Sequence, residues 1–379
     1  MPHRPRVLHV YKDYFPPVMG GVELTINMLA EGCSNRFESS VLVNSTNRTS
    51  SEEIIDGVRV VKVSEWGRAA SAPISPAFVT ALRREAAKAD ILHFHHPNPT
   101  GDLARLLARP SAPVVMTYHS DVVRQKWAMA IYGPLQDWMM RNTEVIMPTS
   151  PDYMESSPWL RRHLPRCKVV PLGIRVEELD ASAETDELAA VIRKRYPGPL
   201  VLFVGRLRYY KGLHFLVEAM ATVPGTLLIA GTGSIQQDLM SLASSLGVSE
   251  RIHFLGDISE EEKRVYYYAA DVFCMPSHLR SEAFGLSQVE AMATGLPVVS
   301  TRIASGVPFV NQDGVSGLTV EPANPVALAE AINAILEDNS LRERLAAGAR
   351  NRARTMFTAQ RMCQDVMAVY DSVLKNQHR

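Results

Sequence analysis

The sequence has few cysteines and no long apolar run. The four cysteines are not spaced as a pair or as metal ligands: Cys33, Cys167, Cys274 and Cys363. Such scattered thiols are typical of a reducing compartment. No apolar run approaches the roughly 18 residues of a membrane-spanning helix, and the apolar stretch near the N-terminus is too short for a secretory signal. The sequence therefore predicts a cytoplasmic protein.

The sequence also lacks a net charge, a dinucleotide-binding motif and an Asp-x-Asp metal motif. Lysine and arginine together number 40, as do aspartate and glutamate, so no net charge favours nucleic acid as a partner. The Gly-x-Gly-x-x-Gly fingerprint of dinucleotide-binding proteins does not occur. Asp-x-Asp is also absent, so a diphosphate clamped by a metal ion has no obvious carboxylate ligands. We expect no bound metal and no cofactor.

Short apolar runs alternate with helix-length segments along the chain. Runs such as "RVLHVY", "DILHFH" and "PVVMTYH" predict parallel strands covered on both faces, and the pattern restarts at "GPLVLFVG". We predict an α/β protein with two doubly wound, Rossmann-like domains that face a cleft, at residues 1–172 and 173–357. A final helix at 358–375 fits either domain.

The stretch "SEAFGLSQVEAMATGLPVV" combines a helix start with two carboxylates. Helical spacing begins near Leu286 and ends at Gly295. A helix N-terminus has unpaired N–H groups and a partial positive charge, which favour phosphate. Glu282, before the helix, and Glu290, inside it, are then placed to accept hydrogen bonds from sugar hydroxyls. The alternative is that Glu282 only balances the helix dipole and Glu290 is a solvated or ion-paired residue.

The segment "GRLRYYKG" follows a strand directly and carries two cations that we single out. Arg206 and Lys211 are spaced so that both can face one point above the strand end. There they would neutralise a diphosphate leaving group. The alternative is a basic turn with solvated side chains.

The N-terminal half offers glycines and histidines at strand ends. Gly20 and Gly21 permit close approach of the backbone to a ligand. His119 follows a buried run, where it can hydrogen-bond a sugar hydroxyl or share transition-state charge; a purely structural histidine is the alternative. The run "HFHHPNP" adds three histidines: His93, His95 and His96. Their spacing suggests a metal, but no nearby cysteine or carboxylate completes a ligand set, so we interpret them as polar lining of the acceptor side.

Together these motifs resemble those of the retaining nucleotide-sugar glycosyltransferases of family four, which have the GT-B fold. The resemblance covers essentially the whole chain, and its most specific part is Glu282-x7-Glu290 followed by "AMATGLPVV", with "GRLRYYKG" upstream. It implies that Glu282 binds the donor hexose and that Glu290 binds the ribose. It also implies that Arg206 and Lys211 bind the diphosphate.

The resemblance extends this set of site residues. It implies that the last helix crosses back to complete the N-terminal domain. The expected catalytic residues are His119, Glu282, Arg206 and Lys211. The further donor-binding residues that it suggests are Gly20, Gly21, Gly205, Ala283, Phe284, Gly285 and Leu286.

A finer resemblance, carried by "ISPAFVTALRREAAKADILHFHHPNP" and "TYHSDVVRQK", is to enzymes of bacterial surface polysaccharide and lipopolysaccharide biosynthesis, including mannosyl- and rhamnosyltransferases. The family resemblance implies a retaining hexosyltransferase, and the absence of Asp-x-Asp predicts that it is metal-independent. GDP-mannose is the first donor expected, with UDP-hexoses next, and the acceptor is expected to be a carbohydrate, polyprenyl-linked. Two alternatives stay open: a nucleotide-sugar epimerase of the same fold, and a non-catalytic sugar- or nucleotide-binding protein.

The segment "DVVRQKWAMAIYGPLQDWMMRN", residues 121–142, joins a tryptophan-bearing apolar pattern to basic residues. An exposed face of this kind can rest on an anionic bilayer, which would suit a lipid-linked acceptor at the inner face of the membrane. The alternative is that the apolar side of the helix packs on the sheet.

Overall fold

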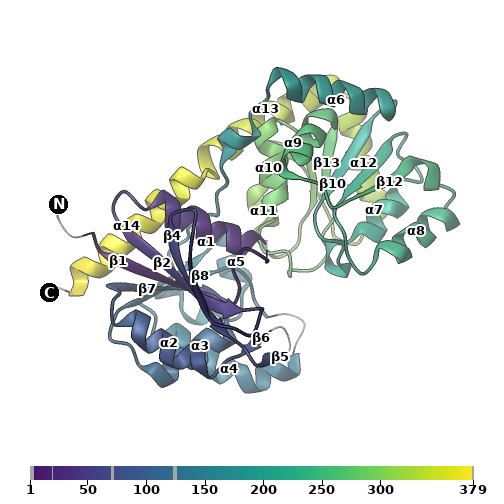
Figure 1. Cartoon of the computed structure of the whole chain (residues 1–379). Coiled ribbons are helices and arrows are strands. Elements are labelled where there is room, and N and C mark those ends of the chain that lie inside the picture. The colour runs from purple at the N-terminus through teal and green to yellow at the C-terminus, as the bar shows by residue number, and fades with distance from the viewer. Residues whose placement is uncertain (1–3, 19, 70–71, 123–125, 378–379) are drawn as a thin grey trace. The chain divides into compact units, whose positions relative to one another are not determined.

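The chain forms two compact units, each with its own mainly parallel sheet (Figure 1). The computed structural model describes residues 4–18, 20–69, 72–122 and 126–377, and it describes no side chain within 126–128. Unit 1 consists of Met1–Gly173 and Ala359–Arg379, and unit 2 of Ile174–Thr358.

Unit 1 is built on a seven-stranded sheet in the order β3-β4-β2-β1-β7-β8-β9, which is parallel except for the edge strand β3. Helices α1 and α14 cover one face, and α2, α3 and α4 cover the other (Figure 1). The strands are β1 (Arg6–Val10), β2 (Glu38–Ser45), β3 (Ser51–Ile55), β4 (Val58–Ser64), β7 (Ile91–His96), β8 (Val114–Tyr118) and β9 (Val145–Pro148), with a separate small pair, β5 (Gly67–Ala69) and β6 (Ala72–Ile74). The helices are α1 (Gly21–Gly32), α2 (Ala77–Ala86), α3 (Pro99–Ala108), α4 (Lys126–Arg141), α5 (Pro151–Ser156) and α14 (Ala359–Gln377).

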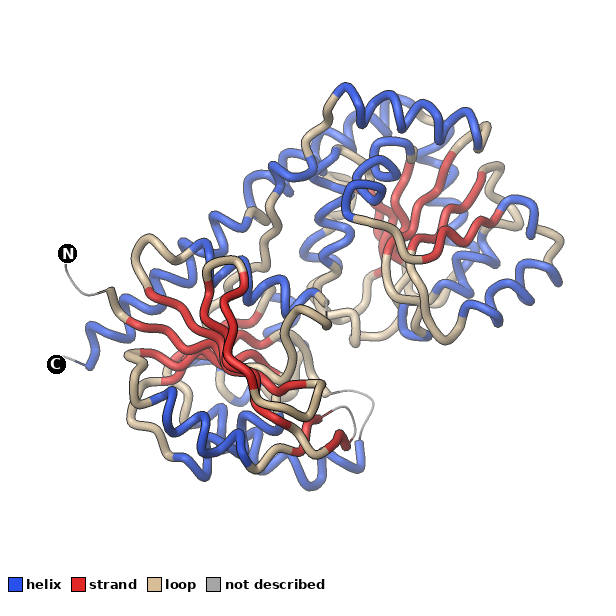
Figure 2. Tube along the Cα trace, in the orientation of Figure 1, coloured by secondary structure: helices blue, strands red, loops and turns tan. Residues whose placement is uncertain are grey.

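Unit 2 is built on a six-stranded parallel sheet in the order β12-β11-β10-β13-β14-β15, enclosed by helices (Figure 2). Its strands are β10 (Leu200–Val204), β11 (Thr226–Ala230), β12 (Ile252–Gly256), β13 (Val272–Met275), β14 (Val298–Thr301) and β15 (Gly317–Val320). Its helices are α6 (Ala183–Arg195), α7 (Leu213–Ala219), α8 (Gln236–Ser245), α9 (Glu260–Ala269), α10 (Leu286–Thr294), α11 (Val307–Val310), α12 (Pro325–Glu337) and α13 (Asn339–Met356).

The apolar runs become strands because both faces of each sheet are covered. Every residue of β10 is buried, as expected for a central parallel strand. The predicted fold class, two Rossmann-like units, is therefore correct. The edge strand β3 escaped the prediction although Asp56 and Gly57, both at positive φ, form the kind of turn that joins two antiparallel strands.

The last helix, α14, packs within unit 1. Tyr370 reaches the sheet, where its hydroxyl lies 2.7 Å from Nδ1 of His93. Arg36, after α1, makes an ion pair of 2.9 Å with Asp371. The chain thus leaves unit 1 after Gly173, forms unit 2, and returns to unit 1 at Ala359.

Helix α4 divides its apolar residues between the interior and the surface. Met139 and Met140 are completely buried, whereas the side chain of Ile131 is 79% exposed. Residues 123–125 of the segment singled out above lie outside the described residues. Within the described part of the chain, no helix is long and apolar enough to cross a membrane.

Candidate active site

In unit 2, a glycine lets the loop after β10 pack closely against the loop after β13. Gly212 has φ of +69°, and a Cβ there would lie 2.0 Å from the backbone oxygen of Pro276. No other residue fits this approach without moving the backbone. The loop starts at Gly205, whose amide donates to Ala230 at 2.9 Å. Arg206 follows at the surface, and the loop then turns inward.

The inward turn buries Lys211 in an ion pair with Glu282. Each side chain is only 10% exposed, and Nζ of Lys211 contacts Oε2 of Glu282. Burial is the largest effect and lowers the pKa of Lys211, but the charges of Glu282 and Tyr210 and the hydrogen bond to Glu282 together outweigh it and raise the pKa above its ordinary value. Ser277 supports the carboxylate with a hydroxyl 3.3 Å from Oε2. Lys211 and Glu282, which the sequence analysis assigned to the diphosphate and to the sugar separately, thus contact each other in an ion pair.

Helix α10 begins beside this pair. Gly285 caps it at φ of +80°, and a Cβ there would lie 2.6 Å from the sulfur of Met275. The amide of Gln288 donates to the carbonyl of Gly285 at 3.1 Å. The amides of Leu286 and Ser287 belong to the helix start, where N–H groups and the helix dipole favour an anion.

Glu290 is held one turn inside α10 by side chains of α9. The hydroxyl of Tyr267 donates to Oε2 of Glu290 at 2.7 Å, and Nζ of Lys263 lies 3.1 Å from the same oxygen. Burial would lower the pKa of Lys263, but the charges of Glu290 and Glu260 raise it. Glu290 is therefore an oriented carboxylate with an 18% exposed side chain. Glu290 is thus ion-paired, as the alternative in the sequence analysis expected, but its side chain still reaches solvent.

In unit 1, Gly20 and Gly21 lie at the start of α1, and His119 directly follows β8. Gly20 is the N-cap of α1, and a Cβ there would lie 2.6 Å from Oε2 of Glu23. His119 follows β8 and is 6% exposed. Its Nε2 lies 3.1 Å from Nδ1 of His95, and its amide donates to the carbonyl of His96 at 3.1 Å.

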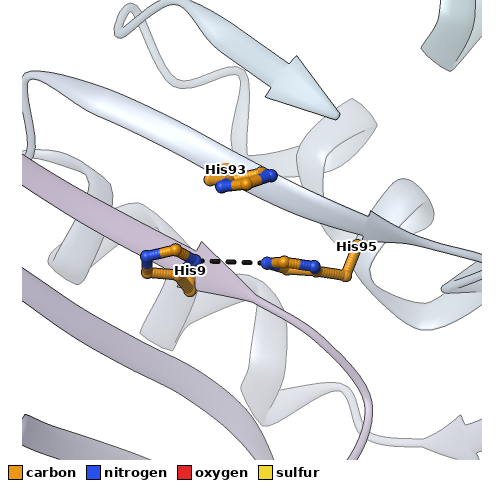
Figure 3. Close-up of side chains that lie close together, drawn as sticks. All are labelled: His9, His93 and His95. Atoms are coloured by element: carbon orange, nitrogen blue, oxygen red, sulfur yellow. Dashed lines mark hydrogen bonds between the residues drawn. The ribbon is translucent and has the colours of Figure 1, made fainter. Parts of the chain in front are cut away.

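The histidines of "HFHHPNP" are not surface lining. His93 and His95 are fully buried and lie beside His9 of β1, a histidine that the sequence analysis did not single out (Figure 3). His96 stands apart: its ring stacks on Tyr118 with centroids 4.5 Å apart. The interpretation of these histidines as lining is therefore wrong for His93 and His95, because the strand that carries both, β7, lies inside the sheet between β1 and β8.

Comparison with known proteins assigns the family. The model "Glycosyl transferase 4-like domain" matches residues 20–173, and the model "Glycosyl transferases group 1" matches residues 184–352. The O-antigen chain mannosyltransferase C of Escherichia coli is 34% identical over 98% of this chain and 99% of its own length. The chain belongs to the group 1, family-4-like glycosyltransferases.

Other relatives agree with this assignment. The D-rhamnosyltransferase WbpZ of Pseudomonas aeruginosa is 34% identical to this glycosyltransferase, over 93% of this chain and 92% of its own length. Two solved structures share the GT-B fold. Sucrose-phosphate synthase from Thermosynechococcus elongatus has a TM-score of 0.81 at 22% identity, covering 98% of this chain and 100% of its own. The Anabaena protein HepE, solved with UDP, has a TM-score of 0.79 at 21% identity, covering 97% and 100%.

The sequence-predicted residues fall into two groups, one in each unit. Unit 2 holds Gly205, Arg206, Lys211, the residues Ala283, Phe284, Gly285 and Leu286, and both glutamates, whereas unit 1 holds Gly20, Gly21 and His119. The supporting residues Ser277, Lys263 and Tyr267 were missed. Lys263 and Tyr267 lie on one face of α9, a pattern that does not by itself indicate a binding site. Their role follows only from the fold, which places α9 beside α10.

The buried ion pair generates a prediction for stability. Replacing Lys211 by Met leaves the buried carboxylate of Glu282 without its cation, which should cost about 3 kcal/mol. Glu282→Gln added to Lys211→Met should restore part of that loss. As a control, Glu321→Gln breaks the exposed pair with Arg302 and should cost less than about 1 kcal/mol. Calorimetry of the full chain compares the three, and equal losses for Lys211→Met and Glu321→Gln would contradict the burial argument.

Proposed function

We propose that this glycosyltransferase moves a hexose from a nucleoside diphosphate sugar to a carbohydrate acceptor, with retention of anomeric configuration, in the biosynthesis of a surface polysaccharide. One observation carries the proposal. The buried Lys211–Glu282 pair lies in the loops that lead to the start of α10, and Glu290 is oriented one turn farther along that helix. This arrangement offers an anion site at the start of α10. The two carboxylates beside it can accept hydrogen bonds from sugar hydroxyls.

The donor proposed first is GDP-mannose, followed by UDP-hexoses. The sugar follows the relatives, because a mannosyltransferase and a D-rhamnosyltransferase each match over more than nine-tenths of the chain. Glu282 is assigned to the hexose, because it precedes the helix, and Glu290 to the ribose. The acceptor is proposed to be a saccharide on a polyprenyl carrier, since the mannosyltransferase relative is named for an O-antigen chain.

In the proposed mechanism, fixed charges assist departure of the diphosphate. Negative charge grows on the leaving phosphate as the glycosidic bond breaks, through an oxocarbenium-like state. Arg206, Lys211 and the amides at the start of α10 stabilise that charge. The leaving phosphate assists the acceptor hydroxyl on the same face of the sugar. His119 is assigned a polar contact with the reacting sugar, and the proposal needs no metal ion and no cofactor.

The test begins with donor recognition. Thermal shift of the full chain with GDP-, UDP-, ADP- and dTDP-sugars should single out one donor, since a ligand of the folded state raises its melting temperature. Incubation of that donor without acceptor should leave the sugar unchanged, whereas an epimerase would convert it. With a polyprenyl-linked saccharide as acceptor, NMR of the product should show the donor's anomeric configuration. A chelator should leave transfer intact, and loss that magnesium restores would contradict metal independence.

The cations of the first loop should govern turnover. Arg206→Ala and Lys211→Ala should each lower kcat by about 10²-fold, because each removes stabilisation of the departing diphosphate. Arg208→Ala is a matched control, because Arg208 is an exposed cation of the same loop for which we propose no donor contact. If both Arg206→Ala and Lys211→Ala transfer at the wild-type rate, the diphosphate is held elsewhere.

The two glutamates should divide between sugar and ribose. Glu290→Gln should weaken binding of the bare nucleoside diphosphate by roughly 1.5–3 kcal/mol, the range for a hydrogen bond to a charged group. Glu282→Gln should bind the bare nucleotide nearly as well as wild type but transfer poorly. Calorimetry with nucleotide and with intact donor separates the two. Equal weakening of nucleotide binding by both variants would show that the assignment is wrong.

A membrane contact through α4 is proposed for the lipid-linked acceptor. Ile131 is 79% exposed on that helix, and Arg141 extends from its last turn with a 70% exposed side chain. Ile131→Glu should lower flotation of the full chain with anionic vesicles, because a charge replaces an apolar anchor. Val326→Glu is the control, since Val326 is 66% exposed in unit 2. Equal flotation of both variants and wild type would place the contact elsewhere.

A further inference from the structure

Three neighbouring strand ends bring His9, His95 and His119 to one face of the unit 1 sheet. His9 of β1 is in register with His93 of β7, and His95 lies two residues farther along β7 on the same side. His119 follows β8, two residues beyond Thr117, which is in register with His95. Each of the three rings is more than nine-tenths buried.

The three rings form a chain of two hydrogen bonds. Nε2 of His119 lies 3.1 Å from Nδ1 of His95. Nε2 of His95 lies 3.1 Å from Nδ1 of His9. The planes of neighbouring rings differ by only 24° and 25°, and their centroids are 5.4 and 5.5 Å apart. With nitrogens 3.1 Å apart at this centroid spacing, the rings meet edge to edge, so the N–H bond of one ring points to the nitrogen lone pair of the next.

Burial keeps these rings neutral. Desolvation lowers the pKa of His9 to about 3 and that of His119 to about 3. Burial also lowers the pKa of His95 well below its ordinary value, and the neighbouring histidines lower it further. A neutral imidazole carries one proton, so one nitrogen donates and the other accepts.

The bonding pattern then couples the three tautomers. His95 uses Nδ1 toward His119 and Nε2 toward His9, so it must donate at one end and accept at the other. If it donates to His119, all three rings carry their proton on Nδ1. If it accepts from His119, all three carry it on Nε2. Nδ1 of His119, the nitrogen outside the chain, is correspondingly a donor or an acceptor.

We propose that His95 is a positioning residue that, with His9, sets the tautomer and ring orientation of His119 through this hydrogen-bonded relay. The consequence for sugar transfer rests on the proposed function, because only there does His119 contact the reacting molecules. The shared tautomer itself does not depend on it. An oriented imidazole meets its ligand with the correct nitrogen already protonated, as partners behind functional histidines generally ensure.

The ring geometry favours this relay over a metal site. One nitrogen from each of His9, His93 and His95 lies within 4.8 Å of the others. However, His93 stacks on His95 with centroids 4.3 Å apart and planes 26° apart (Figure 3). A metal ion lies in the plane of each imidazole that binds it, and two stacked rings do not share such a point. The nitrogens of His93 instead contact Tyr370 at 2.7 Å and Thr117 at 2.8 Å.

The direct test is nitrogen NMR of the full chain labelled with ¹⁵N-histidine near neutral pH. The resonances of His9, His95 and His119 are assigned by single substitutions, and all three rings should show the same tautomer. Different tautomers among the three, or a cationic ring, would overturn the relay. This measurement needs no sugar donor or acceptor, so it stands even if the proposed function fails.

Two variants of His95 cut the relay at different ends. The amide of asparagine reaches the position of Nδ1, and that of glutamine reaches the position of Nε2. His95→Gln should therefore lose the contact with His119 and release its tautomer preference. It should lower kcat by about 10- to 100-fold, the range known for partners that orient metal-bound histidines, with the KM for donor nearly unchanged. His95→Asn should keep the contact and recover most of the turnover.

His93→Gln is the matched control. His93 lies on the same strand and is equally buried, but it hydrogen-bonds outside the relay. This variant should lower the melting temperature and leave both the tautomer of His119 and kcat unchanged. An unchanged His119 tautomer in His95→Gln would reduce the role of His95 to packing and overturn the proposal, as would a copurifying metal ion lost in His93→Gln. Absence of transfer by wild type would contradict only the proposed function.

Discussion

The burial of Lys211 against Glu282 is the constraint on which the loops before α10 in unit 2 of this glycosyltransferase depend. Two charges leave water only when each finds a partner in fixed geometry, and here the partners come from loops after different strands. Gly212 makes their approach possible, because its Cα passes where any Cβ would meet Pro276. The closed loops in turn fix the place where α10 begins. If the proposed function holds, the anion site is organised before any ligand arrives, which is how a protein lowers the reorganisation cost of stabilising a leaving group.

Sequence alone predicts those parts of this arrangement that are local. The strand runs, the start of α10 and the positions of Glu282 and Glu290 follow from periodicity and spacing over a few residues. The Lys211–Glu282 contact joins positions 71 residues apart, and the contact of His9 with His95 joins positions 86 apart. Such pairs depend on strand order, since β1 and β7 are neighbours in the sheet although β2 to β6 intervene in the chain. The edge strand β3 is the opposite case, because its Asp-Gly turn is a local signal of an antiparallel pair, which a pattern of parallel strands does not include.

The parallel strands of the two units follow the same order, but the residues near their carboxyl ends differ in charge. In unit 2, ammonium and carboxylate groups pair with one another: Lys211 with Glu282 in the loops after β10 and β13, and Lys263 with Glu290 between α9 and α10. In unit 1, the corresponding strand ends carry imidazoles whose pKa values burial lowers, His119 among them. Charges suit a partner that becomes more negative during reaction, as a departing diphosphate does. Neutral donors and acceptors suit hydroxyl groups, which present both a proton and lone pairs.

Neutrality also explains why a histidine needs partners behind it. A cationic imidazole donates from both nitrogens whatever its surroundings, but a neutral ring has two tautomers that differ little in energy in water. Burial without hydrogen bonds would leave that choice open, as it does for His96, both of whose nitrogens are buried without a partner among the described residues. His119 differs because His95 contacts it at hydrogen-bond distance and is itself contacted by His9. The same low dielectric that removes the charge of these rings strengthens the bonds between them, so burial and order arise together in the sheet of unit 1.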